Sequence, residues 1–546
     1  MPNAARLPIL ATLVFSFFLA ACASSAAPTV TPITQSTLLP SASSPTLTPR
    51  PTLTPTRAPA LPAIQTPAWF RDIVLYEIFP RSFYDSNGDG IGDLKGITAK
   101  LDYIQNLGVG AIWLTPIFAS PSDHGYDTTD YYQINPDFGT EADLRELVRA
   151  AHQRHIRVLL DFVAAHTSNQ HPFFKDAYGN LHSQYADWYR WTNAAHTQYE
   201  SFASNDIMPS LNYDNPAVQQ YMIDVAKYWM QTGIDGYRCD YVLNVPHAFW
   251  KRLRAELKSI NPDFLLLGEA WTNALGIQPY YADEFDATFD FPLYGDIQGS
   301  HDQIGNSILL GLRSPDVMDG TLAAEQVLYP PGAQRVEFIE NHDTDRAMSQ
   351  VKGDTRRAKL GALLLLTLPG TPMIYYGGEI GMSGVKQSSP RDDKPLREPM
   401  DWYAAEAGPG MTNWYKPPDR NNQPNDGVSV EEQLGKSGSL LEDDRALVAL
   451  RNANSALRTG AMEKIALPGN PNAYAYLRRD STAAFVVVLN FEDKSLPLTL
   501  DLGATSLPDG RYSAIDVLSK RVFNLDELKL SLNLDAAAGY ILKITQ

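Results

Sequence analysis

The feature that most constrains the fold is a repeated alternation of short β-branched runs with segments of helical periodicity. Eight runs have the length and composition of buried strands, and amphipathic segments such as 94–107 and 141–155 lie between most of them. The predicted strands are 73–76, 111–114, 157–161, 236–240, 264–269, 286–290, 336–341 and 371–376. Repeated βα units imply a parallel sheet, and eight of them predict an α/β protein built on a closed (β/α)₈ TIM barrel.

Two segments depart from this barrel pattern. Residues 166–211, after the third strand, are aromatic and polar with little helical period. Insertions of that length are commonly functional, so we expect a subdomain that leans over the strand ends. From 461 to 546, alternating runs such as 484–489 and 539–542 replace the helical pattern and predict a C-terminal antiparallel β-sandwich domain. The barrel is assigned to residues 68–460.

The N-terminal residues predict export and a tether. Arg6 precedes an apolar run, 7–21, which is too short to span a bilayer and is followed by small residues, so 1–22 is interpreted as a signal peptide. The run ends in Leu-Ala-Ala-Cys22, which resembles the bacterial lipobox and implies a lipid-anchored, extracytoplasmic protein. An ordinary secretory signal is the alternative. Residues 23–67 are almost all Ser, Thr, Pro and Ala, as in an extended tether.

Charge and cysteine content narrow the possible partners. A net charge of -17 argues against binding to nucleic acid or to an anionic membrane surface, and it permits a neutral substrate. The chain has 2 cysteines, and lipid on Cys22 would leave Cys239 without a disulfide partner. Cys239 is therefore interpreted as a small buried hydrophobic residue. Nothing in the sequence specifies an oligomeric state, and we take the chain to be a monomer.

Four carboxylates fall at or just after the ends of predicted strands: Asp161, Asp240, Glu269 and Asp343. Catalytic residues of (β/α)₈ barrels lie at the C-terminal ends of the strands. Each carboxylate alone is readily explained as part of a structural ion pair. Four of them on four different strands predict an active site at the open mouth of the barrel.

The sequence around these carboxylates resembles the α-amylase family of glycoside hydrolases from about Trp69 to the C terminus. Four signatures carry the resemblance: Asp161-Phe-Val-Ala-Ala-His166, Gly236-Tyr-Arg238-Cys-Asp240, Gly268-Glu269-Ala-Trp271 and Phe338-Ile-Glu-Asn-His342-Asp343. Asp123-His-Gly-Tyr126-Asp127 and the stretch 370–379 support them. The stretches 208–212 and 397–402 look like those of bacterial α-amylases intermediate between the neopullulanase and oligo-1,6-glucosidase groups.

The resemblance implies a retaining reaction with two carboxylates. Asp240 would be the nucleophile, and Glu269 would protonate the leaving oxygen and then deprotonate the incoming water. Asp343 would support the oxocarbenium-like transition state. Arg238, two residues before Asp240 on the same face of its strand, would keep the nucleophile ionised.

The resemblance also implies residues that bind the sugar on the non-reducing side of the cut. His166 and His342 would form hydrogen bonds with that sugar, and Tyr126 would stack under its ring. Asp123 and Arg346 would line the same end of the site. Without the resemblance, either histidine would be interpreted as a structural residue.

Three positions depart from the family pattern. Ala165 stands where Asn is usual, and Ser210 where Asp is common; both changes remove oxygen ligands of a calcium site that many relatives hold between barrel and inserted subdomain. Asn244 replaces a histidine at the sugar site beyond the cut, where it would shift the product pattern. None of the three removes a catalytic carboxylate.

A different calcium site is predicted at residues 85–93. Side-chain oxygens alternate around a glycine-rich turn, which suits a hard cation such as Ca²⁺. Position twelve is Gly96 rather than Glu, which argues against an EF-hand sensor. Relatives with this stretch bind structural Ca²⁺ there, and an Asx-rich turn without metal is the alternative. The implied ligands are Asp85, Asn87, Asp89, the Ile91 carbonyl and Asp93.

These features predict an α-amylase that cuts internal α-1,4 bonds of starch, glycogen or maltodextrins. An exo-acting α-glucosidase or oligo-1,6-glucosidase on short maltodextrins is the first alternative, and glucosyl transfer is a weaker one. A non-catalytic glucan-binding lipoprotein is a further alternative. Retention of Arg238 with all three catalytic carboxylates argues against it, because binding alone does not require them.

Overall fold

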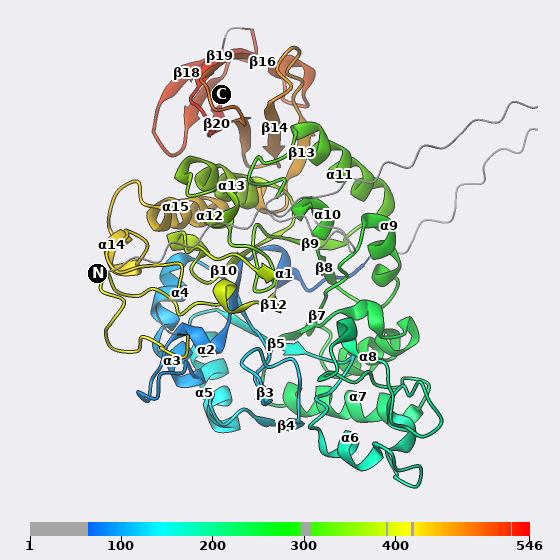
Figure 1. The fold of residues 1–546 in the computed structure, drawn as a ribbon. Coiled ribbons are helices and arrows are strands. Elements are labelled where there is room, and N and C mark those ends of the chain that lie inside the picture. Colours follow the sequence, from blue (N-terminus) through cyan, green and yellow to red (C-terminus); the bar gives the residue numbers. More distant parts are fainter. Residues whose placement is uncertain (1–63, 296–306, 389–390, 416–419, 526) are drawn as a thin grey trace, which may run out of the picture. The chain divides into compact units, whose positions relative to one another are not determined.

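The computed structural model contains a closed barrel of eight parallel strands in the order β1-β10-β9-β8-β7-β6-β5-β2 (Figure 1). The strands are β1 Leu75–Ile78, β2 Ala111–Leu114, β5 Arg157–Phe162, β6 Gly236–Cys239, β7 Leu265–Gly268, β8 Ala287–Phe289, β9 Gln334–Glu337 and β10 Thr371–Tyr375. Each overlaps the range predicted for it, so the predicted (β/α)₈ barrel is confirmed. The structure describes the chain apart from residues 1–63, 296–306, 389–390, 416–419 and 526; the predicted signal peptide, Cys22 and most of the tether therefore lie outside it.

Helices surround the barrel. The longer ones are α5 Glu141–His152, α7 Pro216–Met230, α8 His247–Ile260, α11 Pro315–Leu328, α13 Thr355–Thr367 and α15 Leu440–Ala453. The shorter ones are α1 Ala68–Arg71, α2 Pro80–Phe83, α3 Leu94–Ala99, α4 Leu101–Leu107, α6 Pro172–Ala177, α9 Ala274–Ile277, α10 Phe291–Tyr294, α12 Ala347–Gln350, α14 Val430–Gln433 and α16 Ser455–Arg458. Among the described residues, no helix combines the length and apolar character needed to cross a membrane.

One predicted helix is divided. The segment 94–107 forms α3 and α4, and Lys100 is the C-cap of the first and the N-cap of the second. The Lys100 amide donates to carbonyls of the preceding turn, while its ammonium lies 4.3 Å from the centre of the Tyr84 ring and 3.9 Å from that of Trp402. These cation–π contacts hold Lys100 over two aromatic faces at the junction of the two helices.

The barrel interior is filled by side chains from its strands, as expected for a small parallel barrel. These buried residues include Leu75, Ala111, Trp113, Leu159, Leu265, Leu267, Ala287, Phe289, Val336 and Met373. A second, larger cluster lies between the strands and the helices. The interior is therefore apolar, and the ionisable side chains that follow the strands gather at the carboxyl-end mouth.

The segment after β5 folds with little regular structure. It contains the short helix α6 and isolated β-bridges, including His166–Ser210 and Tyr189–Leu211. Aromatic contacts take the place of a hydrogen-bonded sheet; the rings of Phe173 and Tyr185, for example, stack with centres 3.9 Å apart. Four further short strands belong to small hairpins: β3 Phe118–Ala119, β4 Asp130–Ile134, β11 Gln387–Ser388 and β12 Arg391–Asp392.

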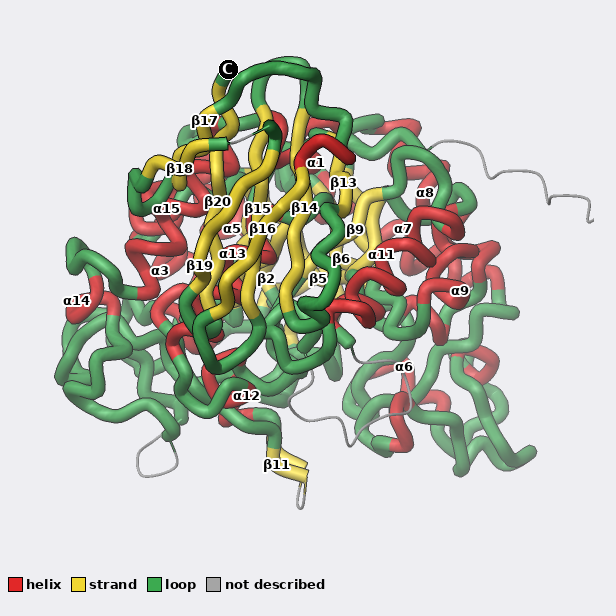
Figure 2. Tube along the Cα trace, turned by 90° about the horizontal axis from the view of Figure 1, so that it is seen from above, coloured by secondary structure: helices red, strands yellow, loops and turns green. Residues whose placement is uncertain are grey.

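The C-terminal strands form a six-stranded antiparallel sheet, β13-β14-β15-β20-β17-β18, and a two-stranded sheet, β16-β19 (Figure 2). Their bounds are β13 Ala461–Lys464, β14 Ala473–Arg479, β15 Ala484–Asn490, β16 Leu496–Asp501, β17 Ser513–Asp516, β18 Val522–Asn524, β19 Lys529–Leu534 and β20 Ala538–Thr545. Inward-facing residues of both sheets, such as Val486, Leu500 and Leu532, share one apolar cluster. The predicted antiparallel C-terminal β-domain is thus present.

Candidate active site

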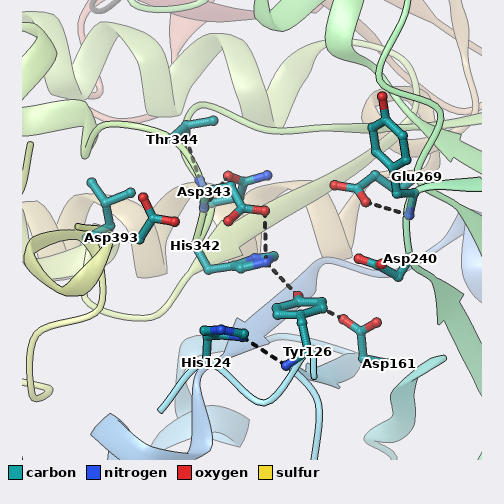
Figure 3. A network of polar contacts seen from close by, with 12 residues as sticks. His124, Tyr126, Asp161, Asp240, Glu269, His342, Asp343, Thr344 and Asp393 are labelled. Carbon is teal, nitrogen blue, oxygen red and sulfur yellow. Dashed lines mark hydrogen bonds and ion pairs between the residues drawn. The ribbon is translucent and has the colours of Figure 1, made fainter. Parts of the chain in front are cut away.

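A cavity of about 820 Å³ opens at the carboxyl-end mouth of the barrel. Asp240 directly follows β6, Glu269 directly follows β7, and Asp343 lies in the loop after β9 (Figure 3). The cavity is lined by Asp123, His124, Tyr126, His166, Phe202, Ala203, Ser204, Asn205, Met208, Asp240, Tyr241, Asn244, Glu269, Trp271, Asp343, Asp392, Asp393, Lys394 and Arg397. The three predicted catalytic carboxylates therefore share one space with the inserted segment and the loops after β2 and β10.

One guanidinium organises the carboxylates. Arg238 Nη1 lies 3.0 Å from both oxygens of Asp161 and 2.8 Å from Asp240 Oδ1. Its Nη2 lies 2.8 Å from Glu269 Oε2. Arg238 is 1% exposed, and its guanidinium stays charged at any working pH. It therefore supplies a permanent positive charge to all three carboxylates, and it opposes the rise in pKa that burial causes at Asp161 and Glu269.

Local backbone geometry aims these groups. Successive side chains of a strand alternate between faces, so Arg238 and Asp240 share the mouth while Tyr237 turns outward and donates to the carbonyl of Ala226. Immediately after them, Tyr241 adopts a left-handed conformation with φ 33° and ψ 62°. Such a conformation costs a non-glycine residue about 1–3 kcal/mol. It directs the Tyr241 N–H to Glu269 Oε2 at 2.8 Å.

The environment separates the roles of the two central carboxylates. Burial raises the pKa of Glu269 to about 8, and the negative charges of Asp240 and Asp343 add to the shift that Arg238 opposes. Glu269 Oε2 accepts from Arg238 and from the Tyr241 amide, which leaves Oε1 to carry the proton. Asp240 Oδ1 is held by Arg238, whereas its buried Oδ2 has no hydrogen-bond partner among the described residues. One protonated carboxyl and one free carboxylate oxygen thus share the cavity.

Asp343 is held in its charged form. Its Oδ1 accepts from Arg397 Nη2 at 2.9 Å, and its Oδ2 lies 3.1 Å from His342 Nε2. Burial alone would raise the pKa of Asp343, but His342 and Arg397 together hold it well below its usual range. Asp343 therefore presents a permanent negative charge to the cavity, as a residue that supports a developing positive charge must.

The predicted sugar-binding residues Tyr126 and His342 form a stacked pair. Their rings lie 5.5 Å apart and 8° from parallel, and the Tyr126 hydroxyl is 2.6 Å from His342 Nε2. The same hydroxyl donates to Asp161 Oδ2 at 3.2 Å. Burial alone would lower the pKa of His342, but Asp343 and Glu77 raise it to about 9. His342 is thus an imidazolium near neutral pH.

His166 and Asp123 also lie on the cavity wall. The fully buried His166 ring stacks on Phe202 with centres 4.9 Å apart, and its Nε2 is 3.1 Å from the Tyr126 carbonyl. Burial lowers its pKa, so the ring is neutral and Nε2–H donates to that carbonyl. Asp123, partly exposed, lies 3.9 Å from Lys394.

Arg346 does not occupy the place that the resemblance implied. It is fully buried behind the cavity wall, where Nη1 donates to the Tyr376 carbonyl at 2.7 Å and the guanidinium stacks on Tyr375 at 3.9 Å. Arg397, with Asp393 and Lys394 beside it, lines the cavity instead. In the sequence, Asp393 stands four residues before Arg397. That spacing was the one sign of their ion pair, and it lies in a loop without periodicity.

The three departures from the family pattern are distributed over two places. Asn244 ends the 3₁₀ turn Val242–Asn244 and lines the cavity. Ala165 is buried and its carbonyl accepts from the Leu211 amide, next to the bridge between His166 and Ser210. In the described part of the chain, no group of three or more His, Cys, Asp or Glu side chains is placed to hold a metal ion.

The loop 85–93 is held by its own hydrogen bonds. Asp85 accepts from the amides of Asn87, Gly88 and Gly90 at 2.6–3.0 Å. Asp93 accepts from Ser86 and caps α3 through the Gly96 amide at 2.7 Å. The donor set of carboxylate, amide and carbonyl oxygens fits a hard cation, although the carboxylates are not gathered into one cluster. Calcium here stays a prediction.

The family described as "Alpha amylase, catalytic domain" matches residues 77–460. The chain is 36% identical to Alpha-amylase 3 of Dictyoglomus thermophilum over 421 residues, 73% of this chain and 80% of that protein. It is 32% identical to Neopullulanase 2 of Thermoactinomyces vulgaris over 508 residues, 87% of this chain and 78% of that protein. The crystal structure of an α-amylase from H. orenii matches with a TM-score of 0.75 at 34% identity, covering 87% of this chain and 100% of that one.

Proposed function

Because the chain belongs to the α-amylase family of glycoside hydrolases, we propose that it cuts internal α-1,4 bonds of starch, glycogen or maltodextrins with retention of configuration. The observation that carries this proposal is that Arg238 contacts both Asp240 and Glu269, each through a separate guanidinium nitrogen at 2.8 Å. These contacts hold a free carboxylate oxygen and a protonated carboxyl in the same cavity. Double-displacement hydrolysis needs this pair of groups.

The proposed reaction has two steps. In the first, Asp240 Oδ2 forms a bond to the anomeric carbon while the bond from that carbon to the leaving oxygen breaks and Glu269 transfers its proton to that oxygen. In the second, Glu269 takes a proton from water, the water oxygen bonds to the anomeric carbon, and Asp240 is released. Asp343 stabilises the positive charge that develops on the sugar ring in both steps.

An exo-acting α-glucosidase is the second candidate, because one contact favours it. The ion pair of Lys394 and Asp123, 3.9 Å long, joins the loop after β10 to the loop after β2. These strands flank β1, which lies opposite β7 and Glu269 in the barrel order. A bridge at that position would close the end of the groove that receives the non-reducing end of a chain.

Iodine staining and reducing ends distinguish the two candidates. Soluble starch is incubated with residues 59–546, which form one compact unit, as wild type and as Asp240→Asn. Internal cutting removes the iodine colour while few reducing ends appear, and Asp240→Asn removes both signals. Reducing sugar that accumulates while the colour persists would support the exo-glucosidase. Retention on a starch gel without turnover of starch, maltodextrins or isomaltose would contradict both.

We also propose that Cys22 carries lipid and anchors the enzyme to the outer face of a bacterial cell or outer membrane. The support is the lipobox-like sequence and the tether that follows it. In an expressing bacterium, Cys22→Ser should move amylase activity from the membrane fraction to the soluble fraction. Cys239→Ser, at the buried thiol, is the matched control and should leave the distribution unchanged. Membrane retention of the Cys22→Ser protein would refute the anchor.

Structural calcium is proposed for the loop 85–93. Asp85, Asn87, Asp89, Asp93 and the Ile91 carbonyl would hold it, and the ion would brace the turn before α3 without taking part in the reaction. Ca²⁺ should raise Tm relative to EGTA, with a smaller rise for Asp89→Asn and none for Mg²⁺ at equal concentration. An equal Tm in Ca²⁺ and EGTA, with no calcium retained after dialysis, would refute the site.

A further inference from the structure

Glu77 is a buried acid at the active-site mouth that neither the sequence motifs nor the reaction scheme uses. It lies on β1 and is 0% exposed. Its Oε1 lies 2.5 Å from His342 Nδ1, and its Oε2 has no hydrogen-bond partner among the described residues. A buried carboxylate with one free oxygen is costly unless its charge is compensated, so the contact with His342 has to supply that compensation.

Both ring nitrogens of His342 face acceptors. Nδ1 faces Glu77 Oε1, and Nε2 faces Asp343 Oδ2 at 3.1 Å. A neutral imidazole has one N–H and one lone pair, so a neutral ring would set its lone pair against one of the two carboxylates. A doubly protonated ring satisfies both with N–H donors. The two carboxylate contacts of His342 therefore favour the imidazolium.

A hydrogen-bond chain runs from this ring toward the nucleophile (Figure 3). In the imidazolium, the one Nε2–H is shared between the Tyr126 hydroxyl at 2.6 Å and Asp343 Oδ2 at 3.1 Å. The proton of that hydroxyl is then directed to Asp161 Oδ2 at 3.2 Å. Arg238 then joins Asp161 to Asp240. We propose that Glu77 is a positioning residue that keeps His342 charged and thereby fixes the direction of this chain, with every donor pointing toward Asp161.

A neutral His342 would change the hydrogen bonds that Glu77 maintains. A neutral His342 with its proton on Nδ1 has an acceptor at Nε2. Tyr126 would then donate to His342 and withdraw its hydrogen bond from Asp161. The Nε2 lone pair would also face Asp343 Oδ2. The protonation of His342 thus decides whether Asp161 keeps its hydrogen bond from Tyr126. Asp161 matters because it shares Arg238 with the nucleophile.

The charges around His342 favour the imidazolium. Glu77 faces it from β1, Tyr126 from the loop after β2, and Asp343 from its own loop; Trp113 of β2 packs edge-on at 5.5 Å. Arg397 donates to the His342 carbonyl, and the negative charge of Asp161 and positive charge of Arg238 lie along the chain. The opposing effects of burial and of these acids leave the pKa of His342 raised to about 9.

The first test is the pH dependence of kcat/KM for wild type and Glu77→Gln, which keeps the shape of the side chain and removes its charge. Without Glu77, the pKa of His342 should fall toward about 6.5, the ordinary value for histidine. In wild type Glu269, whose pKa is about 8, ends the profile before His342 does. A pKa of His342 near 6.5 should therefore move the alkaline limb of the variant down by about one pH unit or more. Superposition of the two profiles would overturn the proposal.

Glu379→Gln is the matched control. Glu379 is equally buried, but it accepts hydrogen bonds from Tyr76 and Tyr103 at 2.7 Å and does not line the cavity. This variant should keep the wild-type profile even if its Tm falls, because its charge lies outside the chain. Glu77→Asp keeps the charge with a shorter reach, so it should keep the alkaline limb while kcat falls. A shifted limb in Glu379→Gln, or an unshifted one in Glu77→Gln, would mean that Glu77 acts only through stability.

A second measurement remains decisive if Glu77→Gln does not fold. In wild type labelled with [¹³Cε1]histidine, one resonance of the 10 histidines should titrate above pH 8 and be missing from His342→Asn. Absence of such a resonance would overturn the proposal. The kinetic test rests on the proposed hydrolytic function, whereas this one does not. Wild type without turnover would therefore refute the function and leave Glu77 to be judged by the titration.

Discussion

At the scale of single residues, the site divides its charges among environments. Burial and the nearby charge of Asp240 raise the pKa of Asp161 to about 7 against the opposing effect of Arg238, and burial raises that of Glu269 to about 8. Asp343, between His342 and Arg397, has a lowered pKa. Carboxyl groups of one site therefore differ in protonation at one pH. Such separation assigns an acid and an anion to the same cavity.

In the proposed reaction, the protonation of Glu269 sets the alkaline limit of wild-type activity. Since it must carry a proton to act as the acid, kcat/KM should fall as the pH rises through about 8. Glu269→Gln should lose about 10²–10⁴ of the rate on maltotriose. On an aryl maltoside with a leaving group that needs no proton, the same variant should lose much less in its first step. Equal losses on both substrates would contradict the role as acid, and circular dichroism checks that the variant is folded.

The predicted site residues that the structure brings together have their contacts near in the chain or at the ends of neighbouring strands. Arg238 and Asp240 share a face because strand side chains alternate, and Glu269 follows the next strand. The resemblance implied that Arg346 lines the cavity, but its side chain turns inward to Tyr375, a direction that a motif position does not specify. Arg397 reaches Asp343 from a distant loop, which spacing alone does not reveal.

At the scale of elements, the strands were predictable because both of their faces are buried, which produces continuous apolar runs. The division of 94–107 into two helices was not, because the contact found at the junction, that of Lys100 with Trp402, joins residues far apart in the chain. The C-terminal sheet was predictable from its alternation, yet its contact with the barrel was not. Arg478 of β14 is fully buried and donates to main-chain carbonyls of the preceding domain.

Arg478 on β14 should be a main stabilising contact between the C-terminal sheet and the barrel. It donates to the carbonyl of Thr367 at the end of α13 and to that of Gly460 at 3.0 Å. Arg478→Met would leave these buried carbonyls unpaired, at a cost of about 1–3 kcal/mol each, and should lower Tm by several degrees. Arg479→Met, one residue on and directed to Ser506, is the control and should change stability by about 0.5 kcal/mol or less. Equal Tm values for the two variants would contradict this role.

At the scale of the whole molecule, buried acids are not confined to the active site. Glu337 on β9 is fully buried, with Arg335 at 3.5 Å, and burial raises its pKa to about 8. Together with Asp161 and Glu269 it binds a proton more tightly in the folded state than in the unfolded chain. The folded protein thus holds protons near neutral pH that the unfolded chain releases, which links its stability to pH.

The sign of that linkage predicts a Tm that falls from mild acid to alkaline pH. A raised folded-state pKa gives stability that is complete below the unfolded value, about 4 for these acids, and is lost as the pH rises through 7–8. The raised pKa of His342 adds a further loss of stability as the pH rises through about 9. Asp343, with a lowered pKa, loses its contribution only in acid.

Calorimetry from pH 5 to 10 should therefore show a decline in Tm, and Glu337→Gln should flatten it, because the amide removes one proton that folding retains. Glu256→Gln, at an acid paired with Lys227 on the surface, should leave the slope unchanged. A Tm that rises over this range would mean that the buried acids are ionised in the folded protein, and the assignment of Glu269 as the protonated acid would fall with it.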